Sequence, residues 1–375
     1  MQYGLALYSN HGICLTSEHN MKKIISDLKT SWQEFNWQSN RTINSIKTGI
    51  ACLFGYLVFK FSTLAQAQWI VISILVVMSA QSTIGGLLIK SYMRFWGTLF
   101  GAIIAAAILL AFDSNPWYIA ITLFITTLCF AYIAGSSKDI SAAGTLGAVT
   151  TAIILLTPNA KISDAGLRFI EILTGLTIAV LVSRFILPIH ARNPLKNSIA
   201  KTLLTLQQYY QNCLNSIIDY NIEVKITTAL PQQQKLIQEI IAEPGKHRLK
   251  ADLYQEILNG ERKIFSAIRL MGYSIKMSTL TCALQLNQHM IDYLGVLSQA
   301  VKNGNAITYN PHLVEMQKNC ENEFKKMALT QDFENNINRS ALIFLLRYLI
   351  DEMQKITLLV QKLNTIKNTK NRRSE

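Results

Sequence analysis

The sequence predicts an all-α protein in which a six-helix transmembrane bundle is followed by a helical cytoplasmic domain. Of its 375 residues, 50% are hydrophobic and only 16% are charged, whereas soluble domains carry about 25% charged residues. The region 41–190 holds just 13 of the 59 charged side chains. This uneven distribution excludes a uniform soluble globule. It predicts a cytoplasmic segment at 1–40, a transmembrane domain at 41–190 and a helical cytoplasmic domain at 191–375.

Six apolar stretches account for the predicted transmembrane domain. Each is about 17 to 23 residues long, which suits a hydrocarbon core of roughly 30 Å. Backbone groups in lipid need internal hydrogen-bond partners, so helices are the expected structure. The expected helices are Thr42–Phe61, Gln66–Ser82, Met93–Phe112, Pro116–Ala134, Ile140–Thr157 and Ala165–Leu187.

Basic residues predict the orientation of these helices, because cytoplasmic loops collect Lys and Arg. We expect a multi-pass protein of the bacterial inner (plasma) membrane with both termini in the cytoplasm. The predicted outer loops contain Lys60 and Lys161. The predicted cytoplasmic segments contain Lys22, Lys23, Lys29, Arg41, Lys90, Arg94, Lys138, Arg192 and Lys196.

Five ionisable residues near or inside the apolar stretches are candidates for a solute pathway, because charges in lipid are costly. Arg168 and Glu171 share one face of the sixth stretch, Arg94 opens the third with Lys90 one turn earlier, and Lys47 lies in the first. Their excess of positive charge favours an anionic solute. Three alternatives remain: Lys90 and Arg94 anchor a helix at the interface, Lys47 extends its ammonium to that interface, or Arg168 and Glu171 form a static pair.

Small and polar residues mark two further features. The segment Gln81–Gly86 interrupts an apolar region, which indicates either a broken helix end lining a cavity or a tight turn between spans. Gln81 is therefore a further pathway candidate. Gly97, Gly101 and Gly175 occur at spacings typical of close helix packing.

Several short motifs resemble the fusaric acid resistance family of membrane proteins, which includes the aromatic acid exporters. The resemblance covers about residues 40–190, and the distantly related plant aluminium-activated malate transporters share this six-helix block. In order, the motifs are Trp69, Ser79, Gln81, Gly85-Gly86, Lys90-x3-Arg94-x2-Gly97-Thr98-x2-Gly101, Arg168, Gly175, Ala179 and Pro188.

This resemblance implies export of small, often aromatic, organic acids across a lipid bilayer. Longer members of the family carry the membrane-plus-cytoplasmic unit twice. No second apolar run of 17 or more residues follows Pro188 here. A single unit suggests a homodimer or larger homo-oligomer, and it leaves open whether one unit transports by the same route.

Residues 194–370 show apolar residues at helical spacing and little strand signal. We expect five or six helices in antiparallel hairpins, with breaks at Pro231, Glu243–Gly245 and Lys302–Asn305. The clearest apolar stripes are Leu249, Leu253, Ile257, Ile264, Ile268 and Met271, and Leu342, Leu345, Leu346, Leu349, Met353, Ile356, Leu359 and Leu363.

The sequence contains no phosphate-binding loop, catalytic triad spacing or metal-ligand cluster. We therefore expect no catalytic residues, no metal and no cofactor. The net charge of +13 fits basic cytoplasmic segments better than a nucleic-acid partner. Three functions stay open: an exporter of small organic anions, possible proton coupling through Glu171 included; an anion channel; and a non-transporting scaffold whose cytoplasmic helices bind a partner.

Overall fold

The protein is described by a computed structural model covering ten segments and a few isolated positions between them. These segments contain eleven helices and no strand, which confirms the all-helical prediction for this part of the chain. The predicted segment 1–40 lies almost wholly outside the described residues. The described segments are 40–62, 68–79, 81–112, 115–136, 140–157, 161–215, 219–245, 248–274, 281–305 and 333–371.

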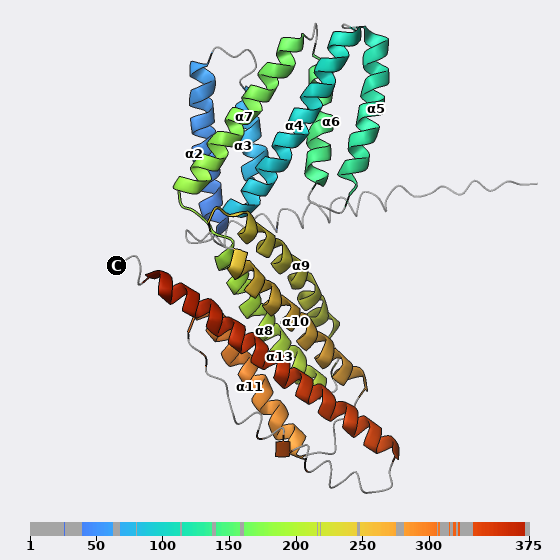
Figure 1. Ribbon diagram of the computed structural model, residues 1–375, viewed down its shortest axis with the longest axis vertical. Coiled ribbons are helices and arrows are strands. Elements are labelled where there is room, and N and C mark those ends of the chain that lie inside the picture. The colour runs from blue at the N-terminus through green and yellow to red at the C-terminus, as the bar shows by residue number, and fades with distance from the viewer. Residues whose placement is uncertain are drawn as a thin grey trace, which may run out of the picture.

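The first six helices form one group, drawn in the upper half of Figure 1. Helices α2, α4, α5 and α7 are long and apolar enough to cross a membrane. Helices α3 and α6 have 11 and 15 residues, so they are shorter than the predicted spans. The bounds are α2 Asn40–Phe61, α3 Gln68–Met78, α4 Ile84–Phe112, α5 Pro116–Ala134, α6 Ser141–Leu155 and α7 Ile162–Phe185.

Helix α4 begins at Ile84, nine residues earlier than predicted. Thr83 caps this start, because its Oγ1 accepts a hydrogen bond from the backbone N–H of Gly86 at 3.1 Å. The expectation that Arg94 opens this helix, with Lys90 one turn before it, is therefore wrong. Both lie inside α4, in its second and third turns.

Three glycines lie where helices of this group approach closely. A Cβ on Gly97 or Gly101 of α4 would lie 2.5 or 2.7 Å from a carbonyl oxygen of α6. A Cβ on Gly175 of α7 would lie 2.6 Å from the carbonyl oxygen of Ile70 in α3. These separations leave no room for a side chain, so backbone contacts set the α4–α6 and α3–α7 spacing.

The remaining described helices form a second group with one continuous apolar core (Figure 1). The predicted breaks at Glu243–Gly245 and Lys302–Asn305 are confirmed, since α9 and α11 end there. The bounds are α8 Arg192–Leu214, α9 Tyr220–Ala242, α10 Arg248–Ser274, α11 Thr281–Asn303 and α13 Phe333–Asn371.

Two expectations about this second group are wrong. Pro231 lies inside α9 instead of ending it. Proline removes one backbone donor, but the burial of Leu230 and Ile237 on either side of it in the common core holds the helix together. Leu249 is 64% exposed, although the later members of its stripe are buried or partly buried. It stands at the start of α10, before the helix enters the core.

The two groups meet where the end of α9 packs against the start of α4. A Cβ on Gly85 would lie 1.9 Å from the carbonyl oxygen of Glu239. The Glu239 carboxylate accepts a hydrogen bond from Thr83 Oγ1 at 2.6 Å, beside the positive N-terminus of α4. Burial raises the pKa of this carboxyl, while the Thr83 hydrogen bond and Lys235 oppose the shift.

One turn later in the chain, Glu243 ties the same end of α9 to the segment that follows α7. Its Oε1 accepts a hydrogen bond from the Ala191 N–H at 2.6 Å, and its Oε2 lies 3.2 Å from His190 Nδ1. The Ile84 N–H also donates to the Ile189 carbonyl at 3.0 Å. Two carboxylates, that of Glu239 in the last turn of α9 and that of Glu243 directly after the helix, therefore join the two groups of helices.

We predict that Gly85→Ala lowers the melting temperature in detergent micelles, because the added methyl collides with backbone of α9. Overpacking of this kind costs about 1–3 kcal/mol. Gly166→Ala on α7 is the matched control, since nothing lies within 4 Å of its Cβ position. That control should melt at or above the wild-type temperature, because Ala is the better helix former. Equal melting of the two variants would contradict the close contact at Gly85.

The core of the second group contains one fully buried carboxyl, that of Glu261 in α10. It faces Gln233 of α9, whose Nε2 donates to Thr202 Oγ1 of α8 at 2.9 Å. Burial raises the pKa of Glu261 well above its ordinary value, and the neighbouring Gln233 side chain opposes that shift. The folded protein therefore holds this proton more tightly than the unfolded chain does.

This proton makes stability depend on pH. As pH rises above the ordinary Glu value of 4.5, the unfolded chain loses the proton first, so the free energy of unfolding falls until the folded carboxyl also ionises. We predict that Glu261→Gln removes this fall and is more stable than wild type at alkaline pH. Urea unfolding at several pH values measures it. A constant difference between the two proteins at every pH would refute the assignment.

Candidate functional site

Four of the predicted pathway residues are buried within the apolar helices. The exposed fraction is 0% for Lys47, 5% for Arg94, 5% for Arg168 and 1% for Glu171. They come from α2, α4 and α7, which pack together with α3 around a common apolar cluster. Ionisable groups are rare inside such helices and need polar partners there. Their contacts therefore decide what this region can bind.

Arg94 lies in a buried polar strip on α4. Its Nη2 donates to Ser73 Oγ of α3 at 3.2 Å, and Ser73 is itself fully buried. Ser91 and Thr98 lie one turn before and after Arg94 on the same face. Within the described part of the chain, Ser91 Oγ, Arg94 Nε and Thr98 Oγ1 are buried and have no hydrogen-bond partner. Each such group costs about 1–3 kcal/mol, so this strip suits a polar ligand or water.

Arg168 and Glu171 form an ion pair with Nη1 and Oε2 3.3 Å apart. The Arg168 guanidinium also lies over the ring of Trp69 in α3, with Cζ 4.5 Å from the ring centroid. One turn after Glu171, Gly175 lies against Ser73, whose Cβ is 2.8 Å from the Cβ position of the glycine. The ion pair and Arg94 are therefore gathered around the same helix, α3.

Lys47 occupies the end of the bundle near the second group of helices. Its Nζ donates to Ser183 Oγ of α7 at 3.1 Å. Asn44 and Thr48, its neighbours on α2, line an open pocket of about 600 Å³. Gln81 lines the same pocket, although the sequence did not place it beside α2. The full lining is Asn40, Arg41, Asn44, Ser45, Thr48, Ser79, Gln81 and Ser82.

Lys90 lies near the Arg94 set, but among the described residues it makes no contact with α3 that would join it to the ion pair. It is half-buried, one turn before Arg94 on α4, and its ammonium lies near two like charges, those of Arg94 and of Lys235 in α9. The structure thus brings Arg94, Arg168 and Glu171 to α3, and it places Gln81 beside the pocket at the Lys47 end. It does not bring all the candidates into one pocket.

Sequence reasoning missed the hydroxyl groups that accept hydrogen bonds from the buried cations, Ser73 and Ser183. It also missed the contact of Trp69 with Arg168. The buried polar strip on α4 could have been predicted, because Ser91 and Thr98 flank Arg94 at helical spacing inside an apolar stretch. The two serines carry no such signal, since their roles depend on which helices become neighbours.

The charged groups are spread along the bundle from one end to the other. Lys47 lies in the first half of α2 and Arg168 in the first half of α7, and these two helices begin at opposite ends of the bundle (Figure 1). In the described part of these six helices, Glu171 is the one buried acid beside three buried bases. Such an arrangement attracts anions into a low-dielectric region and can hold them by charge-assisted hydrogen bonds.

We predict that Glu171→Gln destabilises the protein by about 3–5 kcal/mol, the usual cost of removing one partner of a buried ion pair. The double variant Arg168→Met/Glu171→Gln should lose less stability, because it buries no unmatched charge. Thermal unfolding of both single variants and the double variant in detergent gives the coupling energy. If the two single losses simply add, the pair is not energetically coupled.

Comparison with known proteins agrees with this membrane character. Residues 50–182 match the model of the family described as fusaric acid resistance protein-like. The chain is also similar to the inner membrane protein YeeA of Escherichia coli (strain K12), with 23% identity over 233 residues. That alignment covers 61% of this chain and 65% of YeeA, so the chain spans less than two thirds of its relative. The family resemblance predicted from the sequence is therefore confirmed.

Proposed function

Because residues 50–182 resemble the fusaric acid resistance family, we propose that this chain is an inner-membrane transporter that exports small organic anions. Aromatic carboxylates are the expected substrates. The observation that supports this proposal most directly is the burial of three bases and one acid inside apolar helices. Charges held at such cost in a membrane protein mark substrate or ion pathways.

The proposed route begins at the pocket beside Gln81, which is lined by the start of α2 and by residues that follow α3. An anion entering there meets Lys47 first and Arg94 next. The Nε of Arg94 and the hydroxyl of Ser91 have hydrogen-bonding capacity that no described residue uses. An anion at this point would satisfy both groups and replace its lost hydration.

Aromatic side chains support the choice of an aromatic substrate. Phe95 of α4 and Phe169 of α7 follow Arg94 and Arg168 directly in sequence, and their ring centroids are 5.6 Å apart. Trp69 lies beside Arg168 at the same level of the bundle. A ligand with a carboxylate and a flat apolar body would match both features.

Glu171 is the proposed site of proton coupling. Its carboxylate pairs with Arg168, so the guanidinium is already engaged when Glu171 is ionised. Protonation of Glu171 would weaken that pair and free Arg168 to bind the anion. Deprotonation would restore the pair and release the anion, so the proton and the anion would cross the membrane together, and the outward gradient of the anion would drive export.

The arrangement in the membrane is part of the same proposal. We place both termini in the cytoplasm, residues 41–190 across the bilayer as six helices, and residues 191–375 in the cytoplasm. The short helices α3 and α6 would then cross a part of the bilayer lined by their longer neighbours. A homodimer or larger homo-oligomer is the proposed assembly, without catalysis or a cofactor.

We predict that proteoliposomes holding only this chain transport 4-hydroxybenzoate, and that Arg94→Met reduces the flux at least tenfold. Lys60→Met is the matched control, because Lys60 is an exposed base in the last turn of α2. Its flux should equal that of wild type. Large unitary currents would indicate the anion channel instead. No flux of any organic anion would favour the scaffold.

We also predict that an imposed proton gradient accelerates transport by wild type and not by Glu171→Gln. The residual flux of that variant should follow the substrate gradient alone. Circular dichroism and gel filtration of the variant check that it is folded. Gradient-dependent flux in a folded Glu171→Gln protein would remove this residue from the coupling mechanism.

A further inference from the structure

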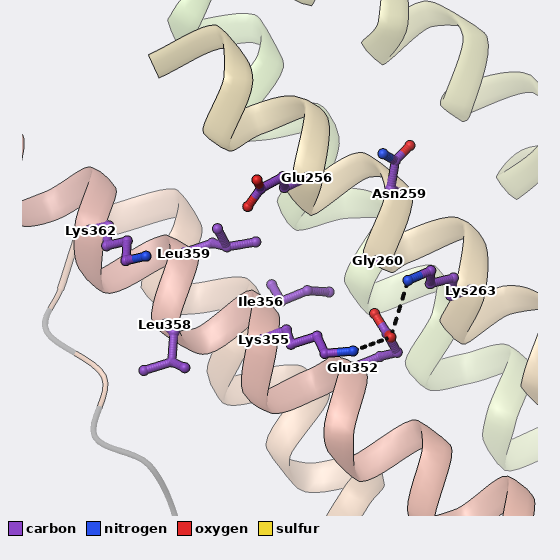
Figure 2. A pocket seen from close by; sticks show the side chains of 10 residues that line it. All are labelled: Glu256, Asn259, Gly260, Lys263, Glu352, Lys355, Ile356, Leu358, Leu359 and Lys362. Carbon is purple, nitrogen blue, oxygen red and sulfur yellow. Dashed lines mark hydrogen bonds and ion pairs between the residues drawn. The ribbon is translucent and has the colours of Figure 1, made fainter. Parts of the chain in front are cut away.

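A second pocket lies within the second group of helices, between α10 and α13. Its volume is about 350 Å³, within the usual range for small-molecule sites. Gly260 of α10 lies directly against α13, since a Cβ there would lie 2.8 Å from Ile356 Cγ1. Ile356 and Leu359 of α13 are buried and supply apolar lining. Figure 2 shows this pocket with charged side chains around it.

One end of the pocket is built around Glu352. The exposed fraction of its side chain is only 4%, and its Oε1 lies 3.2 Å from Lys263 Nζ and 2.8 Å from Lys355 Nζ. Figure 2 shows the two lysines reaching this carboxylate from the two different helices. One buried acid therefore fixes two ammonium groups at the same point.

These two ammonium groups keep binding capacity after they contact Glu352. Each carries three N–H donors, and the contact with Glu352 uses one of them. Both lysine side chains remain about half exposed to solvent, at 49% and 62%. Glu352 balances one of the two positive charges, and the neighbouring Asp351 of α13 adds a further negative charge near Lys355. The Glu352 end can therefore accept a second anion without displacing the first.

The other end of the pocket carries Glu256 and Lys362, one from each helix (Figure 2). Their charges balance, so the pocket as a whole has an excess of one positive charge from three lysines and two acids. The buried side chains of Ile356 and Leu359 lie between the two ends. The pocket thus combines a fixed cationic end with an apolar middle.

We propose that this pocket binds a small organic anion with one carboxylate and an apolar body. The carboxylate contacts Lys263 and Lys355, and the apolar body lies against Ile356 and Leu359. This is a second site, separate from the proposed pathway. It would let the α8–α13 helices respond to the concentration of such an anion. The binding proposal itself does not depend on transport.

Hydrogen–deuterium exchange of the full chain in detergent tests the proposal, because it reports on each helix separately. Millimolar benzoate should slow exchange in peptides of α10 and α13. Benzamide, which lacks the charge, and acetate, which lacks the apolar body, should produce at most a tenth of that protection at equal concentration. Absence of protection in α10 and α13 would overturn the proposal, whatever happens in α2–α7.

Two variants distinguish a specific binding site in this pocket from nonspecific attraction of anions to surface lysines. Lys355→Met should reduce the apparent benzoate affinity at α10 and α13 at least tenfold. Its side chain is largely exposed, so the fold should survive the change. Lys201→Met, an exposed base on α8 outside this pocket, should bind like wild type. Equal losses of benzoate affinity in both variants would show a nonspecific charge effect and would refute the site. Because this readout ignores flux, it can fail or succeed independently of the proposed transport.

Discussion

The contact between Glu239 and the start of α4 is the constraint on which the rest of the structure depends. The backbone of α9 approaches Gly85 so closely that no side chain fits. Thr83 binds the Glu239 carboxylate and caps α4 with the same hydroxyl oxygen. These bonds determine where α4 begins. The same helix carries Arg94, which donates to Ser73 of α3, so the second group of helices contacts the element that places a charged group inside the first.

Buried charges organise the apolar group from within. Each cation has a polar or aromatic partner on another helix: Ser183 for Lys47, Ser73 for Arg94 and Trp69 for Arg168. These partners link α2, α3, α4 and α7, whereas glycines bring α4 and α6 together. Because bases outnumber acids and some donors have no described partner, the region is better suited to an anion than to a purely structural network.

The two proposed anion sites share one arrangement of charged groups in different surroundings. In each, a carboxylate is held by a base: Glu171 by Arg168, and Glu352 by Lys263 and Lys355. Within the membrane-type helices the pair is buried, so protonation is the natural way to open it. Between α10 and α13 the lysines reach solvent, so an anion can join the pair without a proton. The first arrangement suits coupled transport, and the second suits sensing.

The sequence by itself determined the composition-dependent features. Apolar stretches indicated where the helices lie, an i, i+3 spacing predicted the pairing of Arg168 with Glu171, and short motifs indicated the family resemblance. The tertiary structure decided whatever depends on neighbours. Pro231 stays inside a helix because packing in the core outweighs one lost hydrogen bond, and α4 starts early because α9 lies against Gly85. Ser73 and Ser183 become partners of buried bases only through folding, because hydrogen bonds between distant residues leave no periodic trace in the chain.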